Sequence, residues 1–192
     1  RSVSFELNEQ VNGTIDHVFC QAGGGGLAIG TAEGFLQLAS ENRISRAPRV
    51  HVVQPSGNDT IATPLRDGAP TGRDVNCTTK ISGLQVASVT DADGAITACR
   101  DTDGTGYLVE DEHVWEIQQQ LAREEGIFCE PAAAVSLAGA LRAIEMGEVS
   151  PDSSIVCIIT GSGFKDPPSV EKMIGSAQCP LIDPAEVRHH MS

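Results

Sequence analysis

The segment that decides the fold reads Ile155-Val156-Cys157-Ile158-Ile159-Thr160-Gly161-Ser162-Gly163-Phe164-Lys165-Asp166-Pro167. Its first five residues are apolar and mostly β-branched, which predicts a buried parallel strand. The strand ends in a hydroxyl and two glycines, so the pattern places the polar Thr160 at the carboxyl edge of a sheet. Open α/β sheets bind their ligands at that edge. The segment therefore predicts a ligand site, although an isolated threonine here could also be a helix or turn cap.

A second strand-to-glycine junction lies upstream, in His17-Val18-Phe19-Cys20-Gln21-Ala22-Gly23-Gly24-Gly25-Gly26. Four glycines before a helix allow a tight turn whose N–H groups point outward, and the helix dipole adds positive potential. This arrangement suits a phosphate monoester, and a flexible tight turn is the structural alternative. The spacing also fits the dinucleotide pattern G-x-G-x-x-A, but that pattern needs an acidic residue at the end of the next strand. This strand ends in Gln54-Pro55 instead, which weakens the nucleotide interpretation.

Two further segments carry candidate site residues. The first is Gly126-Ile127-Phe128-Cys129-Glu130-Pro131-Ala132, where a carboxylate between an apolar run and a proline would be costly to bury unpaired. Glu130 therefore either caps the following helix or faces a site. The second is Ser82-Gly83-Leu84, which is either a plain turn or a turn against a ligand.

The remaining pattern predicts an open parallel sheet with helices on both faces, a three-layer α/β fold. Predicted strands cover residues 17–21, 49–54, 86–89 and 155–159, with an irregular loop over 55–80 and a turn at 91–94. Predicted helices cover residues 26–40, 112–125 with Asp111 as N-cap, 131–146 and 169–175. A first helix presents Val3, Leu7 and Val11 on one stripe and stops at Asn12-Gly13. Because this helix begins almost at Arg1, we expect a truncated or cleaved polypeptide.

Composition excludes several classes of function. The net charge of −13 is spread along 192 residues and forms no basic patch, which disfavours nucleic-acid and anionic-membrane binding. No apolar run approaches the roughly 20 residues of a membrane span. The six cysteines contain no C-x-x-C pair, and the acidic turn at Asp91 lacks the ligand spacing of a calcium loop, so we expect no metal site. Cys20, Cys129 and Cys157 lie in apolar runs and are expected to be small buried residues of a cytoplasmic protein.

In their order along the chain, the segments at residues 17–26, 126–132 and 155–167 resemble the C-terminal half of the fold-type-II pyridoxal-phosphate (PLP) enzymes. The resemblance is closest to the threonine synthases and their ammonia-lyase relatives. The segment from Thr160 to Pro167 is similar to the threonine synthase pattern, with Ser162 and Phe164 as small departures. The tetraglycine loop looks more like that of the serine/threonine ammonia-lyases and serine racemases. The resemblance implies that residues 1–192 are the C-terminal portion of the catalytic domain, within the large domain of a homodimeric enzyme.

The resemblance also implies a role for individual residues. Thr160 would face the pyridine nitrogen of the cofactor, Glu130 would lie beside the ring, and the turn at Gly83 would lie over it. The phosphate would be held by Gly23, Gly24, Gly25, Gly26 and Leu27. A neutral partner such as Thr160 leaves the ring nitrogen unprotonated or weakly protonated, which suits elimination and replacement at the β and γ carbons. In racemase-like relatives, acidic residues after the third-strand equivalent help to hold a divalent cation, and Gln54 in place of the leading acid makes that site doubtful.

The positions of the lysines limit the activity that can be expected of this chain. A PLP enzyme needs a lysine for the Schiff base, and in the family it lies in the N-terminal half. Lys80, Lys165 and Lys172 are the three lysines of this chain, and none stands at a matching position. We therefore expect this chain alone to be inactive, and its partner to be the missing N-terminal half or a complementary chain.

Three interpretations of function follow from this resemblance and its limit. The first is a threonine synthase, which converts a small amino-acid substrate, phosphohomoserine, to threonine. An ammonia-lyase or racemase of the same family is the alternative. A non-catalytic ligand-binding domain or a Rossmann-type nucleotide binder represents a different class.

Overall fold

The computed structural model describes residues 1–88, 91–175 and 183. Its centre is a parallel sheet with the strand order β3-β2-β1-β4. The strands are β1 (His17–Gln21), β2 (Arg49–Pro55), β3 (Gly106–Val109) and β4 (Ile155–Cys157). Every strand pair is parallel, with Phe19 opposite His51 on one side and Cys157 on the other. The predicted parallel sheet is confirmed.

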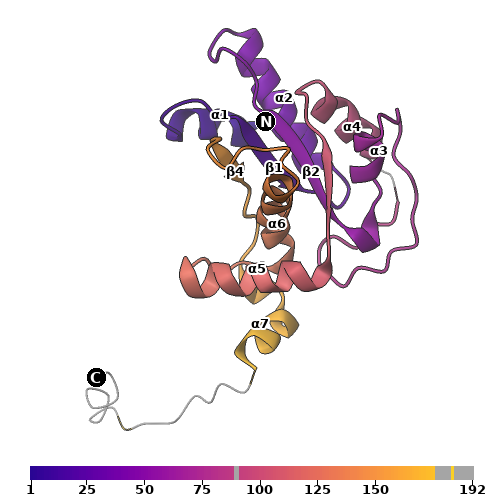
Figure 1. Ribbon diagram of the computed structural model, residues 1–192, viewed down its shortest axis with the longest axis vertical. Coiled ribbons are helices and arrows are strands. Elements are labelled where there is room, and N and C mark those ends of the chain that lie inside the picture. The colour runs from indigo at the N-terminus through magenta and orange to yellow at the C-terminus, as the bar shows by residue number, and fades with distance from the viewer. Residues whose placement is uncertain (89–90, 176–182, 184–192) are drawn as a thin grey trace.

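Helices cover both faces of this sheet (Figure 1). One face carries α1 (Ser2–Gln10), α2 (Gly26–Ser40), α3 (Ala62–Arg66) and α4 (Ala92–Arg100). The other carries α5 (Asp111–Glu124) and α6 (Pro131–Glu145), while α7 (Pro167–Ile174) follows β4. Two short 3-10 turns complete the described elements, η1 (Ser56–Asn58) and η2 (Gly163–Lys165). Within the described ranges, no helix is long and apolar enough to cross a lipid bilayer.

Strand alternation produces two apolar cores, one for each face. Val18 and Cys20 point to the core under α2 and α4, whereas Phe19 points to the core under α5 and α6. Neighbouring Val52 and Val53 divide in the same way. All five residues of β1 are buried because β1 has a neighbour on each side and a helix layer on each face. This three-layer arrangement is the predicted one.

The first helix packs differently from its predicted apolar stripe. Val3 is 38% exposed, whereas Ser4 is fully buried and donates a hydrogen bond of 2.7 Å to the carbonyl of Thr31. Ser4 lies against Gly34, where an added Cβ would come within 2.7 Å of the Ser4 hydroxyl. The helices α1 and α2 therefore meet through small residues, and the close approach turns Val3 outward.

Two α-helices and one strand of the described structure were missing from the prediction. The segment 55–80, predicted to be irregular, contains α3, and the predicted turn at Asp91 begins α4. The strand β3 was not predicted at all, while residues 86–88 form no strand and Val89 lies outside the described residues. Helix α3 depends on a tertiary contact, because the side-chain carbonyl of Gln54 accepts from the N–H groups of Ile61 and Ala62. Such a contact has no local sequence signal.

Two predicted elements differ at their ends. The prediction of a buried strand over 155–159 was too long, since β4 ends at Cys157, its residues are half-buried and Ile159 is 37% exposed. It is an edge strand, with β1 as its one neighbour in the part of the chain that the structure describes. Helix α5 starts at Asp111 itself rather than after it. The Asp111 carboxylate accepts hydrogen bonds from the Thr79 hydroxyl and the Lys80 N–H instead of capping its own helix.

Candidate functional site

The glycine loop, residues 23–26, joins β1 to α2 at the carboxyl edge of the sheet. Gly25 caps α2 with φ +104°, and a Cβ there would lie 2.9 Å from the Cβ of Ala95. Gly24 is different, because a Cβ at this position would meet no atom within 4 Å. Gly26 opens α2 and Leu27 follows half-buried in its first turn, where backbone N–H groups have no partner within the helix. The loop thus borders an open space beside helix N–H donors.

The turn at Gly83 lies against this loop. Gly83 has φ +84°, and its carbonyl oxygen would be 3.3 Å from a Cβ on Gly23. A Cβ on Gly83 would in turn lie 3.7 Å from the Cβ of Ala132 in the first turn of α6. The Asn58 amide secures the turn by donating a 2.7 Å hydrogen bond to the Leu84 carbonyl. The turn therefore connects the glycine loop with the segment that contains Glu130.

Thr160 lies at the centre of a hydrogen-bond network on the same edge. Its Oγ1 accepts from Nε2 of Gln21 at 2.7 Å and donates to Oε1 of Glu130 at 3.2 Å. The other carboxylate oxygen of Glu130 lies 3.4 Å from Nζ of Lys165. Gln21 is 4% exposed and the Glu130 side chain 14%, whereas Thr160 is exposed. The exposed hydroxyl is thus held between two largely buried polar groups.

Backbone contacts lock the Glu130 and Thr160 segments together. The N–H of Glu130 donates to the carbonyl of Gly161 at 2.9 Å, and the N–H of Gly163 donates to the carbonyl of Phe128 at 3.1 Å. Between them, Cys129 and Ser162 form an antiparallel bridge. A side chain at Gly161 would overlap the Glu130 carboxylate. The absence of a side chain at Gly161 therefore lets the Glu130 carboxylate lie directly against this segment.

The structure brings all the predicted site positions to one edge of the sheet, as a row from the glycine loop through Gly83 and Glu130 to Thr160. Sequence reasoning missed two members, Gln21 and Lys165. Gln21 had a usable signal, because a polar residue closing an apolar strand stands at the carboxyl edge, as Thr160 does. Lys165 had been considered only as a Schiff-base lysine, and the structure pairs it with Glu130.

The set fits a phosphorylated ring better than a dinucleotide. Gln54, where a ribose-binding acid would stand, is fully buried, with Nε2 donating to the Ala22 carbonyl and the Thr60 hydroxyl. Its amide is therefore committed to the fold. The open space at Gly24 and the N-terminus of α2 could hold the phosphate. The negative charge of the Asp91 carboxylate would repel a phosphate there, because its Oδ2 would be 3.9 Å from a Cβ on Gly26.

Two buried acceptors at this edge, Oε1 of Gln21 and Oδ1 of Asn58, have no partner among the described residues. Oε1 of Gln21 is shielded from solvent and makes no hydrogen bond among the described residues. A buried polar atom left unpaired costs about 1–3 kcal/mol. Such an orphan beside Thr160 is consistent with a site that receives a ligand.

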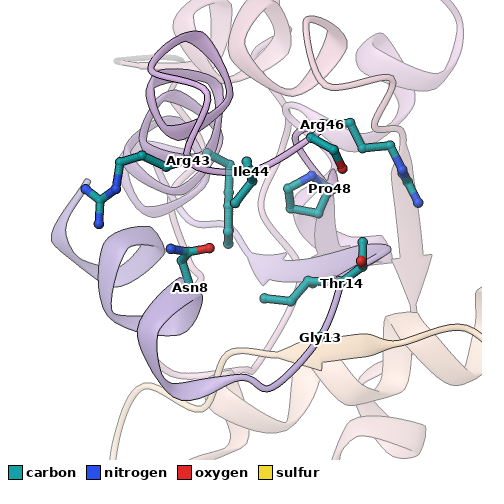
Figure 2. Close-up of a pocket in the computed structure, with 10 residues that line it drawn as sticks. Asn8, Gly13, Thr14, Arg43, Ile44, Arg46 and Pro48 are labelled. Atoms are coloured by element: carbon teal, nitrogen blue, oxygen red, sulfur yellow. The ribbon is translucent and has the colours of Figure 1, made fainter.

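A separate cavity of about 240 Å³ lies at the other end of the sheet. Asn8, Thr14, Ile44 and Pro48 surround it (Figure 2). Its lining comes from the end of α1 and from the segments that precede β1 and β2. It therefore lies at the amino ends of these strands, away from the Thr160 network.

A histidine pair also lies toward the amino ends of the strands. His17 Nδ1 and His51 Nε2 are 2.9 Å apart, and the N–H of Thr105 donates to His51 Nδ1 at 3.1 Å. The second contact makes Nδ1 of His51 an acceptor, so its Nε2 carries the proton and donates to His17. Burial lowers the pKa of His51 to about 3. The two rings are stacked in the interior, with their centroids 5.2 Å apart.

Comparisons with known proteins agree with this geometry. Residues 1–161 match the family described as pyridoxal-phosphate dependent enzyme. A threonine synthase of Methanocaldococcus jannaschii is 33% identical over 172 residues, which cover 87% of this chain and 42% of that protein. The processed form of threonine deaminase isoform 2 from Solanum lycopersicum has a TM-score of 0.72 at 24% identity, over 93% of this chain and 48% of that one. Serine racemase from Dictyostelium discoideum has a TM-score of 0.63 at 26% identity, over 84% of this chain and 48% of that one.

The chain spans about half the length of these relatives or slightly less. The family match nevertheless covers most of its own residues and includes the glycine loop, Glu130 and Thr160. By this match and by its fold, the chain belongs to the pyridoxal-phosphate dependent enzymes of fold type II.

Proposed function

We propose that the full-length protein is a threonine synthase that converts phosphohomoserine and water to threonine and phosphate. The observation that carries this proposal is the exposed Thr160 hydroxyl, held at the carboxyl edge of the sheet between Gln21 and Glu130. The segment around it is similar to the threonine synthase pattern, and curated threonine synthases are about 30% identical to this chain. The bound cofactor would supply an electron sink for chemistry at the β and γ carbons of an amino acid.

This chain's own residues would bind and orient the cofactor. The N–H groups at the start of α2 would bind its phosphate in the open space at Gly24. Gly83 would cover it, since its turn lies between Gly23 and Ala132. Thr160 would bind the ring nitrogen, and Glu130 would hold the Thr160 hydroxyl in place. Each role uses a group that already faces this edge of the sheet.

The lysine that binds the cofactor would lie in another part of the protein or in a complementary chain. Two observations support this proposal. The chain spans about half the length of its relatives, and β4 has one free edge in the described structure. We further propose that residues 1–192 alone are inactive and that the complete enzyme is a cytoplasmic homodimer. Light scattering of the purified protein tests whether the enzyme is a homodimer, and cell fractionation tests whether it is cytoplasmic.

A serine/threonine ammonia-lyase or serine racemase is the second candidate. It is favoured by the tetraglycine loop, residues 23–26, which looks more like the loop of those enzymes. The two candidates share the cofactor and differ in the bond that breaks, so substrate assays separate them.

The test uses the full-length protein that contains this chain, supplied with PLP. Incubation with O-phospho-L-homoserine should release phosphate and threonine in equal amounts. Release of ammonia and a 2-oxo acid from serine or threonine, or formation of D-serine, would instead support the second candidate. Borohydride reduction followed by peptide mapping should place the cofactor on a lysine other than Lys80, Lys165 and Lys172. Absence of every activity, with no reducible adduct, would favour a non-catalytic ligand-binding domain.

A further inference from the structure

Gln54 is a buried polar side chain beside the glycine loop to which the proposed function gives no role. It lies at the carboxyl end of β2 and is fully buried. Its Nε2 donates to the Ala22 carbonyl at 3.2 Å and to the Thr60 hydroxyl at 2.9 Å. Its Oε1 accepts from the N–H groups of Ile61 at 2.7 Å and Ala62 at 2.9 Å. The amide therefore uses both of its donors and both lone pairs of its oxygen.

These partners fix the orientation of the amide. The Ala22 carbonyl can only accept a hydrogen bond, and the N–H groups of Ile61 and Ala62 can only donate one. Turning the amide round would bring two carbonyl oxygens together and would place an amino group against two N–H donors. The donor half of Gln54 therefore serves the end of β1, and the acceptor half serves the start of α3.

The donor half holds the point at which the chain enters the glycine loop. The Ala22 carbonyl belongs to the peptide bond that joins Ala22 to Gly23, and it accepts from Gln54. The N–H of Ala22 donates to the Val53 carbonyl at 3.0 Å, so both backbone polar groups of this residue are bound to β2. The direction in which the loop leaves β1 is therefore set by β2.

The acceptor half supports the other end of the loop through Ile61. Its hydrogen bond fixes the backbone of Ile61, the residue that caps α3. The Cδ1 atom of Ile61 would lie 3.2 Å from a Cβ on Gly25, which is the N-cap of α2. A Cβ on Gly24, between the two ends, would meet no atom within 4 Å. The loop is thus held at both ends and open in its middle, where the proposed function places the phosphate.

We propose that Gln54 is a positioning residue that holds the glycine loop in the shape that binds the cofactor's phosphate. This inference rests on the proposed binding of PLP at that loop. All donors and acceptors of the Gln54 amide are used within the fold, so it acts through the loop and not by contact with the cofactor. A loop that is already held in its binding shape loses less conformational freedom when the phosphate binds, which raises the affinity.

The test compares the binding of PLP with that of pyridoxal, which lacks the phosphate, to the full-length protein. The ratio of the two affinities measures what the phosphate contributes. Gln54→Glu keeps the length and the acceptor for α3, but an ionised carboxylate cannot donate to the Ala22 carbonyl. Its affinity for PLP should fall by about tenfold, the effect of one lost charge-assisted hydrogen bond, while its affinity for pyridoxal stays nearly unchanged. The ³¹P resonance of the bound cofactor should move toward that of free PLP.

A second variant and a matched control separate this role from a general loss of stability. Gln54→Met removes both halves of the amide, so it should show the same selective loss of PLP together with lower stability in urea. The control is Gln118→Met, in α5 on the other face of the sheet. Gln118 is also fully buried and also donates from Nε2 to a backbone carbonyl, that of Cys129. This control should lose stability and keep the wild-type ratio of the two affinities.

Ile61→Val keeps the backbone N–H that Gln54 binds but removes the Cδ1 atom that lies against Gly25. If neither Gln54 variant folds, this milder variant decides, because a wild-type ratio and ³¹P resonance overturn the inference and a lower ratio supports it. An equal fall of both affinities in folded Gln54→Glu also overturns it. Failure of the wild-type protein to bind PLP removes the proposed function together with this inference, whereas unchanged PLP binding in Gln54→Glu removes the inference alone.

Discussion

The backbone N–H of Glu130 donates a 2.9 Å hydrogen bond to the carbonyl of Gly161, so two segments distant in sequence form one wall of the site. The approach is close enough that a methyl group at position 161 would overlap the Glu130 carboxylate. That carboxylate also holds Thr160 and Lys165. The geometry of the network therefore depends on the absence of a side chain at Gly161.

Gly161→Ala should destabilise the folded protein and weaken PLP binding together. The added methyl group would displace the Glu130 carboxylate from Thr160, and the loss of that hydrogen bond lowers the free energy of unfolding by about 0.5–1.5 kcal/mol. Urea denaturation with and without PLP measures both effects. Gly24→Ala is the control for stability, because its Cβ would meet no atom within 4 Å. Equal stability of the two variants would contradict the close contact.

Gly24→Asp should fold normally and lose PLP. The open space accommodates the side chain, but its charge would repel the phosphate that we place there. The loss should exceed tenfold in affinity, since one charge-assisted hydrogen bond alone contributes about 1.5–3 kcal/mol. Absorbance titration with PLP measures the affinity. Gly24→Asn, of the same size but neutral, should weaken binding less, and unchanged affinity in the aspartate variant would place the phosphate elsewhere.

Thr160→Ala should change the cofactor site more than it changes the fold. The substitution removes the hydrogen bonds to Gln21 and Glu130, each contributing about 0.5–1.5 kcal/mol. We expect weaker PLP binding and an altered ratio of reaction products, measured by titration and by chromatography. Thr160→Ser keeps the hydroxyl and should preserve the wild-type ratio. A stability loss with an unchanged ratio in the alanine variant would make Thr160 a structural cap.

His51 should make the protein sensitive to acid. Its pKa is lowered from 6.5 to about 3, first by burial and then by the nearby His17 and Arg49. The folded protein therefore binds fewer protons than the unfolded chain between these values, and the free energy of unfolding falls as the pH drops below about 6.5. One such group contributes a slope of up to about 1.4 kcal/mol per pH unit. Burial lowers the pKa of His17 as well, which acts in the same direction.

Denaturation of the full-length protein between pH 4 and pH 8 tests this effect. His51→Gln should flatten the dependence on pH in that range. His113→Gln is the control, because His113 lies in the first turn of α5 and is not part of the buried histidine pair. If the free energy of unfolding depended on pH equally in wild type and His51→Gln, the pKa of His51 would be the same in the folded and unfolded protein.

Asp91→Asn should strengthen phosphate binding at the glycine loop. The Asp91 carboxylate lies near Gly26 and opposes a phosphate dianion without touching it. At such separations in a solvated site, removing the repulsion should improve affinity by a factor of about 2 to 5, and less at high salt. Titration with PLP at two salt concentrations measures the gain. Asp93→Asn serves as a comparison, since its carboxylate accepts from the N–H of Gly72 instead.

The parts of the fold that could be predicted are those whose cause is local. The apolar run of β1 and the four glycines that follow it define a strand, a turn and a helix from adjacent residues alone. The helix α6 was equally clear, because Pro131 marks its first turn. By contrast, α3 begins where it does because the Gln54 side chain reaches across to its first N–H groups.

The candidate site likewise contains residues that the local sequence could predict and residues that only the fold brings in. Gly24, Glu130 and Thr160 stood in recognisable segments, so their meeting at one edge of the sheet could be anticipated. Gln21 closes an apolar strand, and its polar side chain there marked the carboxyl edge of the sheet, but its partner Thr160 lies 139 residues away and is known only from the fold. Lys165 became relevant through the fold as well, because η2 places its Nζ beside Glu130.

In the part of the chain that the structure describes, β4 has one free edge, and this has a practical consequence for work with this chain by itself. Unpaired N–H and C=O groups along a strand edge are a template for pairing with other chains, and here the apolar Ile159 and the 83% exposed Phe164 follow on the same segment. A polypeptide limited to residues 1–192 is therefore expected to self-associate as its concentration rises. Co-expression with the complementary part of the enzyme should suppress this aggregation, as should a lysine in place of Ile159.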